Sequence, residues 1–237
     1  MDGFGMQITR DDGVIFASPE FTPTVLVQVM DRTADYTGDV SAQHYYETIV
    51  PNAKKCFIFH KILSTGSQQG ASGGVLHYAE QGPNGFWRVH TTAGTAGTAG
   101  LAHTIRFYVF SEFVANIPEW GIYFYKDGQL VYTGNCLPLD IKFWERPQLT
   151  TPAPTMPCAT ICSVARQLTQ GIPGTNPPTA LIFLFCFTGF SSGIITPVFR
   201  QISQSAGGGS ADGFSKGCAY IETSLYDQYY KASLGYA

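Results

Sequence analysis

Charge is the feature that this sequence has least of. Lys, Arg, Asp and Glu together make up 13% of the 237 residues, against roughly 25% in an average soluble domain. The 14 Lys and Arg residues do not gather into a basic cluster, and the formal net charge is −3. Since a nucleic-acid-binding protein normally carries a concentrated basic patch, the sequence predicts no nucleic-acid partner.

Long hydrophobic runs are also missing. The most apolar run, Ala180 to Phe187, is eight residues long, whereas a membrane-spanning helix needs about 20. We therefore expect no membrane span and interpret this run as a strand buried on both faces. The opening residues, Met1 to Gly5, lack the basic and apolar stretches of a secretory signal, so we expect a protein made in the cytoplasm.

Metal-binding patterns are weak. The six cysteines include no Cys-x-x-Cys pair, and the zinc-finger spacing is absent. His77 and His90 lie at the outer ends of a predicted hairpin, and they face each other if its turn is centred between Pro83 and Asn84. A cross-strand pair supplies only two of the three or four ligands that a metal needs. We predict no metal site and no cofactor.

Catalytic signatures are missing as well. The sequence has no Gly-x-Ser-x-Gly elbow, and Asp11, Asp12 and Asp127 are explained by turn chemistry, because Asp side chains hydrogen-bond within their own turns. The glycine-rich stretch Gly207 to Gly213 lacks the Gly-Lys-Ser/Thr of a phosphate loop. We therefore predict a protein that is not an enzyme and has no catalytic residues.

Turn residues and aromatics are abundant instead. The chain contains 26 Gly and 14 Pro, and aromatics make up 14% of it. This composition predicts an all-β fold, an antiparallel β-sandwich built from hairpins with long Gly/Ser/Thr-rich loops and under about one-tenth helix. We expect a single domain over residues 1–237; the alternative is two β halves, about 1–118 and 119–237.

Apolar or alternating runs locate the remaining expected strands. These are Thr24–Met30, Lys55–Leu63, Val75–Ala79, Phe86–Thr91, Thr104–Phe110, Thr179–Phe187, Ile194–Ile202 and Cys218–Leu225. The segment from Asp31 to Ala53 is mixed and polar and predicts no strand. Cys158 to Leu168 fits either a strand or a short helix, because its periodicity does not decide between them.

Two hairpins of one design stand out. Ile122–Tyr125 and Gln129–Thr133 are β-branched and aromatic runs on either side of Asp127-Gly128, and Asp-Gly in this position is a strong hairpin signal. The first residues repeat the design, with Asp12-Gly13 as the turn, and a proline follows each turn glycine by ten residues. We predict that Gly13 and Gly128 are structural turn residues with positive φ.

These hairpins carry a resemblance to a known family. An opening aromatic-Gly-Met-Gln-Ile with Asp-Asp-Gly, followed later by Gly-Ile-x-x-Tyr-x-x-Gly-x-Leu-Val-Tyr, resembles small tail proteins of long-tailed bacteriophages. The matching residues are Gly5 to Phe16 and Gly121 to Thr133; Thr133-Gly134 stands where the family often has Asp-Ser. The resemblance implies a non-enzymatic structural component of the tail tip or tail fibre, located in the virion and active in assembly and host attachment.

The low charge and the family resemblance both indicate which partners this protein has. Low charge indicates that a partner covers part of the surface, and the resemblance points to other tail proteins, to a homotrimer and to contact with a host surface receptor. The aromatic tail either packs by its tyrosines or lies against a neighbour. Tyr226 to Tyr236 and the Pro147 to Pro157 arm are the first candidates for the interface. The alternative function is a carbohydrate-binding module that contacts a cell-surface glycan. Its candidate contacts are Trp87, Trp120 and Trp144, for which core packing is the competing interpretation.

Overall fold

The computed structural model is built mainly from β-strands. It describes residues 8–9, 15–17, 23–37, 42–65, 75–93, 102–126, 128–145, 151–162, 166–172, 179–190, 196–206 and 217–236. The described residues form sixteen strands and one eleven-residue α-helix. The all-β prediction is confirmed, and the pairing is almost entirely antiparallel.

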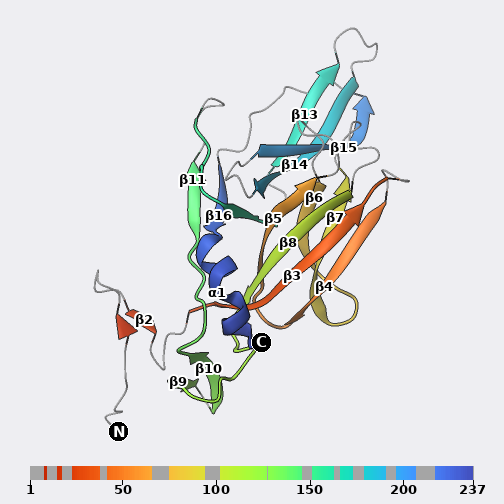
Figure 1. Ribbon diagram of the computed structural model, residues 1–237. Helices are drawn as coiled ribbons and strands as arrows, with labels where there is room; N and C mark the ends of the chain where they lie inside the picture. Colours follow the sequence, from red (N-terminus) through yellow and green to blue (C-terminus); the bar gives the residue numbers. More distant parts are fainter. Residues whose placement is uncertain are drawn as a thin grey trace.

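A large sheet forms the centre of the molecule (Figure 1). Its six neighbouring strands are, in spatial order, β3 (Val25–Asp35), β8 (Ala102–Ser111), β5 (Phe57–Thr65), β12 (Cys158–Ile161), β16 (Gly217–Glu222) and β11 (Lys142–Glu145). Strand β5 is central because it pairs with β8 on one side and with β12 on the other. Its apolar residues alternate between the two faces of the sheet, so both faces bury a core.

Three further strands extend from this sheet. They are β13 (Arg166–Ile172), β14 (Thr179–Phe190) and β15 (Thr196–Ala206), with β14 in the middle. The end of β14 runs parallel to β5, where Gly189 pairs with Lys61. A Cβ on Gly189 would collide with the carbonyl of Cys158, so glycine is what allows β14 to meet β12 and β5 here.

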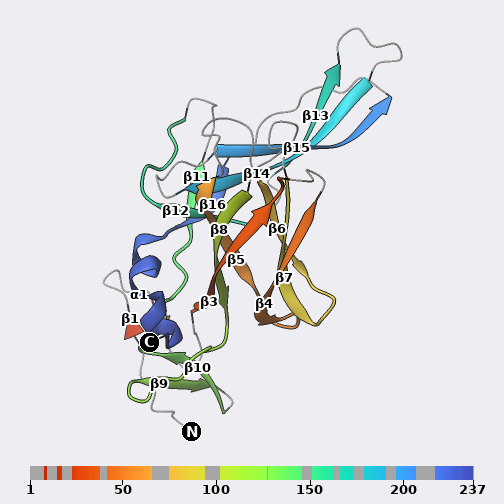
Figure 2. The same ribbon diagram turned by 45° about the vertical axis from the view of Figure 1, so that its right-hand side comes forward.

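A smaller sheet packs on one face of the large one (Figure 2). Its strands, in spatial order, are β4 (Gln43–Pro51), β7 (Phe86–Ala93) and β6 (Val75–Gln81). Val50 and Val89 from the small sheet and Ile58, Ile105 and Phe107 from the large sheet share one buried cluster. The predicted hairpin of β6 and β7 is confirmed.

The helix α1 (Ser224–Leu234) covers the opposite face of the large sheet. Tyr226 is buried there with Phe59, Tyr108 and Phe110. The layers are therefore small sheet, large sheet and helix, which adds a layer to the two-sheet arrangement predicted from sequence. The strand predicted for Cys218–Leu225 ends at Glu222, and the helix begins at Ser224.

Both predicted Asp-Gly hairpins lie in separate two-stranded antiparallel sheets. The first pairs β1 (Ile8–Thr9) with β2 (Ile15–Ala17), and the second pairs β9 (Tyr123–Lys126) with β10 (Gln129–Thr133). The chain after β10 then meets the start of β3, where Leu26 N–H donates to the Leu137 carbonyl at 2.8 Å. Pro138 forms a single bridge with Val25 and ends this short pairing.

Two strands were missed in the sequence. Strand β4 lies inside the stretch predicted to be polar and irregular, and β11 lies just before the Pro-rich arm. In β4 the residues alternate between exposed and covered positions, but Tyr45 and Ile49 lie on the exposed face and Thr48 on the covered one, so polarity does not alternate with exposure. Within the described residues, no helix is long and apolar enough to cross a membrane.

Candidate functional site

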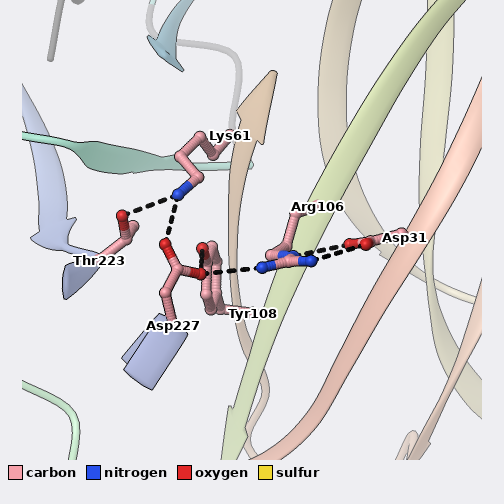
Figure 3. Close-up of polar contacts among 6 residues, drawn as sticks. All are labelled: Asp31, Lys61, Arg106, Tyr108, Thr223 and Asp227. Carbon is pink, nitrogen blue, oxygen red and sulfur yellow. Dashed lines mark hydrogen bonds and ion pairs between the residues drawn. The ribbon is translucent and has the colours of Figure 1, made fainter. Parts of the chain in front are cut away.

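A row of charged residues crosses the helix-covered face of the large sheet. Lys61 on β5 and Asp31 on β3 each pair with Arg106 on β8, so the three side chains stand next to one another on neighbouring strands. Helix α1 places Asp227, in its first turn, above this row (Figure 3). The carboxylate lies at the N-terminal end of the helix, where the backbone dipole favours negative charge.

The Asp227 carboxylate accepts hydrogen bonds from both cations of the row, Lys61 and Arg106. Lys61 Nζ donates to Asp227 Oδ2 at 2.5 Å and to Thr223 Oγ1 at 2.9 Å. Arg106 Nη1 donates to Asp227 Oδ1 at 3.0 Å. Figure 3 shows the Asp227 carboxylate between the two cations, so the first turn of the helix is tied to two different strands of the sheet.

Two further contacts complete the network. Tyr108 OH donates to Asp227 Oδ1 at 2.6 Å. Arg106 also donates through Nε and Nη2 to the two oxygens of Asp31, each at 2.7 Å. This two-point pairing fixes the plane of the guanidinium group as well as its position.

Burial and charge together set the protonation of the network. Burial alone would raise the pKa of Asp227, but hydrogen bonds from Lys61, Tyr108 and Arg106 and the charge of Lys61 outweigh it and hold that pKa below its usual value. Burial raises the pKa of Tyr108, and its bond to the Asp227 carboxylate raises it further. The pairing with Asp31 raises the pKa of Arg106. The carboxylate therefore stays ionised and the phenol neutral at neutral pH.

The network is built to hold the helix rather than to react. Lys61 is 4% exposed and its ammonium group is paired, so it is neither an accessible nucleophile nor a free base. Removing one partner of such a buried pair leaves an uncompensated charge. The sequence did offer a signal for this network: Lys61 and Arg106 are single charges in otherwise apolar strands, and such charges require partners.

The three tryptophans occupy very different places. Trp144 is 9% exposed and packs edge-on against Phe187, with ring centroids 5.5 Å apart. Trp87 packs against the core between the sheets and donates from Nε1 to the Lys54 carbonyl at 2.9 Å. Trp120 is 82% exposed. Of the three residues singled out for sugar stacking, only Trp120 presents its ring to solvent.

Four exposed apolar side chains lie in β9 and in the residues just before it. Trp120, Ile117, Ile122 and Tyr125 are between 52% and 82% exposed and lie within nine residues of one another. Phe124 and Tyr132 on the same hairpin are buried in the inter-sheet core. We call the four exposed residues the tip residues, because the hairpin lies at one end of the molecule (Figures 1 and 2).

The turn of this hairpin has the geometry that its sequence requires. Gly128 has a φ of 77°, in the left-handed region that glycine adopts without a steric cost. Gln129 pairs with Lys126, so Gly128 directly precedes the first paired residue of β10. The other predicted turn glycine, Gly13, lies outside the described residues.

The predicted pairing of His77 with His90 is wrong. His77 pairs with Thr91, and His90 pairs with Tyr78, so the two histidines point to opposite faces of the small sheet. The turn is one residue longer than assumed, with Gln81 paired to Trp87. On the inner face, His77 instead lies beside His60, with ring centroids 4.1 Å apart.

In the described part of the chain, no three His, Cys, Asp or Glu side chains form a group that would hold a metal ion. Five cysteines have described side chains, Cys56, Cys136, Cys158, Cys162 and Cys218, and no two of these five form a disulfide. Burial raises the pKa of Cys56 to about 12 and that of Cys158 to about 11. Both are therefore protonated at neutral pH and poor nucleophiles.

Comparisons with known protein families, with curated proteins and with solved structures find no match for this chain.

Proposed function

We propose that this chain is a non-enzymatic structural component of a bacteriophage tail tip or tail fibre. It acts by assembling with copies of itself and with other tail proteins, and it contributes to host attachment. The resemblance of residues 5–16 and 121–133 to small phage tail proteins supports this proposal. The observation that carries it is the solvent exposure of the four tip residues, of which Ile122 and Tyr125 lie in the second segment and Ile117 and Trp120 lie just before it.

The tip residues are suited to burial against another protein chain. Trp120 is 82% exposed and Ile117 63% exposed, although large apolar side chains usually lose contact with water on folding. Interface cores are rich in aromatic residues and poor in charged ones. Glu119 and Lys126 flank this surface and are both exposed, which fits the polar rim that surrounds such a core.

The charged network supports a structural role for the protein. Its two cations and its carboxylates bind one another, and its geometry ties the helix to the sheet. A firmly held scaffold of this kind suits a protein whose work is to present a surface. This argument favours assembly over catalysis.

The second candidate function is glycan binding at Trp120. An exposed indole face binds a pyranose ring by apolar contact, and Trp120 has the exposure that this mode needs. Trp87 and Trp144 do not compete for this role, because each packs into a core. The glycan hypothesis therefore depends on Trp120 alone among the three candidates.

The molar mass of the purified full-length chain, measured by light scattering at micromolar concentration, distinguishes the two functions. Assembly predicts a homo-oligomer, with a trimer expected, that dissociates in the Trp120→Ser and Ile122→Ser variants. The matched control is Phe86→Ser, which removes a 40% exposed apolar side chain from the small sheet. A soluble monomer that binds a glycan through Trp120 would contradict self-assembly and establish the alternative.

A further inference from the structure

Three buried histidines gather in the layer between the two sheets. His60 comes from β5 and His103 from β8 of the large sheet, and His77 comes from β6 of the small sheet. Their exposed fractions are 0%, 2% and 0%. Histidines are seldom buried so fully, and here three of them occupy one apolar layer.

We call His60, His77 and His103 the histidine cluster; His60 and His77 are in direct contact, and the charge of His103 acts on His77. The rings of His60 and His77 are 4.1 Å apart, and His77 meets Phe107 edge-on at 5.9 Å. Cys162 Sγ lies 3.4 Å from Nδ1 of His60. Within the described residues, Nε2 of His60 and both ring nitrogens of His77 and of His103 have no hydrogen-bond partner.

Among the residues that the structure describes, no carboxylate pairs with a histidine of this layer. On the strands that contribute the cluster, Lys61 and Arg106 bind Asp227 and Asp31 on the opposite face. Glu80 pairs with Arg88 on the outer face of the small sheet.

Arg32, an exposed cation of β3 that acts on Tyr46, adds positive charge at this face. Apart from it, the other titratable side chains described in the inner layer are phenols, thiols and one histidine at the rim of β4. They are Tyr36, Tyr46, Tyr132, Cys56, Cys136, Cys162 and His44. Ala34 pairs with His103, and the next residue, Asp35, is exposed. The Asp35 carboxylate accepts a hydrogen bond from the Thr37 N–H. None of these groups supplies a negative charge to the cluster at neutral or mildly acidic pH.

The strands β14 and β15 also pack on β6. The sequence from Cys162 to Ala211 contains no Asp or Glu at all, and its titratable residues are Cys162, Arg166, Cys186 and Arg200. These strands therefore cannot supply a counter-charge either. A proton taken up by the cluster would create a cation in an apolar layer without an anion to pair with it.

We propose that the histidine cluster makes the joint between the two sheets acid-sensitive, so that protonation releases the β4–β7–β6 sheet from the large sheet. The layer opens because the protonated rings gain hydration only when the sheets separate. The device is independent of the proposed function, since it depends on the inter-sheet core and not on the tip residues.

The direction of the pH effect follows from the protonation of each state. Burial lowers the pKa of His60 to about 3. Burial also lowers the pKa of His103, and burial with the neighbouring charges of His60 and His103 lowers that of His77 well below its usual value. In the open state each returns to about 6.5. The closed joint is therefore fully stable above about pH 6.5 and loses stability as the pH falls below it.

Hydrogen exchange of the full-length chain at pH 7 and pH 5 tests this proposal, with rates corrected for their intrinsic pH dependence. Each histidine favours the open state by up to roughly 25-fold over this interval. We expect the hydrogen-exchange rates of the β6 and β7 amides to rise from pH 7 to pH 5 by the product of the factors for the three histidines. His77→Gln and, separately, His103→Gln should each remove one such factor, whatever their effect on stability at pH 7.

The matched control is His44→Gln. His44 lies at the rim of the same layer and contacts the Asp35 carbonyl at 3.0 Å, so its substitution should leave the acid response intact. Exchange in β6 and β7 that is the same at both pH values would overturn the proposal. Zinc binding at pH 7 that is lost in Cys162→Ser would also overturn it, because the cluster would then be a metal site.

Discussion

Lys61 and Arg106 are single charges in strands that are otherwise apolar, and their partners come from other elements. Because the two strand segments are apolar, they are predicted to be buried. The sequence therefore indicates that each charge needs a partner, but it does not identify that partner. The partner of both is Asp227, which is more than 100 residues away in the chain. Single-sequence reasoning cannot find such a pair, because only the folded sheet brings the residues together.

Asp227→Ala should be strongly destabilising. The variant leaves Lys61, which is 4% exposed, as a buried cation without its carboxylate, and breaking such a pair costs about 3–5 kcal/mol. Urea denaturation of the variant and the parent protein measures the difference. Gln228→Ala, at the next and exposed position of the helix, is the matched control and should change stability by less than about 0.5 kcal/mol.

Replacing both partners distinguishes pairing from simple packing. Lys61→Met with Asp227→Leu removes the charges together and should recover most of the stability lost in Asp227→Ala, since apolar replacements of buried ion pairs are often tolerated. If Asp227→Ala unfolds at the same urea concentration as the parent protein, the network does not hold the helix.

Gly128→Ala should weaken the β9–β10 hairpin by about 1 kcal/mol, because alanine is strained at a φ of 77°. Chemical denaturation or hydrogen exchange of the hairpin amides measures this change. Gly134→Ala is the control: it lies just after the same hairpin, and its nearest neighbouring atom would be 4.0 Å from an added Cβ. Equal effects at both positions would argue against a special turn geometry at Gly128.

At the scale of elements, the hairpins were the most predictable part of the fold. Asp-Gly between two β-branched runs correctly located β9 and β10, and alternation correctly located β6 and β7. The sequence did not reveal β4 and β11, because β4 mixes polar and apolar side chains on both of its faces and the four residues of β11 give too little pattern. Pairing register was also missed, and one extra turn residue moved His90 to the outer face.

The helix was missed for a different reason. Tyr226, Tyr230 and Leu234 are four residues apart and pack on the sheet, but in so short a segment this spacing was interpreted only as an aromatic tail. The packing of Tyr226 and the Asp227 network stabilise the helix more than propensity does. The C-terminal end of the helix, in contrast, is determined by the local sequence. Gly235 has a φ of 73°, and Tyr236 N–H donates to the Lys231 carbonyl at 2.8 Å. This glycine-capped ending is a signal that sequence reasoning can use.

Gly217→Ala should separate β11 from β16. A Cβ at this position would overlap the Trp144 carbonyl, and the backbone φ is 153°. We expect faster hydrogen exchange in Lys142–Glu145 and a loss of stability larger than that of Gly85→Ala. Gly85 also has positive φ, but an added Cβ there would face open space. Comparing the two variants therefore distinguishes the cost of backbone strain from the cost of the steric collision. Equal losses in the two variants would contradict this account.

At the scale of the whole molecule, the C-terminal tail belongs to the fold of its own chain. Tyr226 is 2% exposed and packs with Leu26, Phe59 and Phe110, which is the first of the two roles that the sequence left open for the tail. Leu225, Tyr229 and Tyr236 remain between 45% and 53% exposed. The helix therefore has one face in the core and other side chains available to a partner.

Deleting Tyr226 to Ala237 should leave the protein insoluble. The deletion uncovers the apolar face of the large sheet and removes the carboxylate that pairs with Lys61. Measuring the soluble fraction after expression tests this expectation. Tyr236→Ser, which changes only a 53% exposed side chain, should stay soluble. A truncated chain that is soluble and folded would show that the helix is dispensable for the fold.

The central claim is that this chain is part of a virion, and finding it in purified particles tests that claim most directly. Mass spectrometry of gradient-purified phage that encodes the chain should detect it at a fixed number of copies per particle. Antibody labelling in electron micrographs should place it at the tail tip or on a tail fibre. If the chain accumulates in the lysate but is absent from the particles, the account is contradicted.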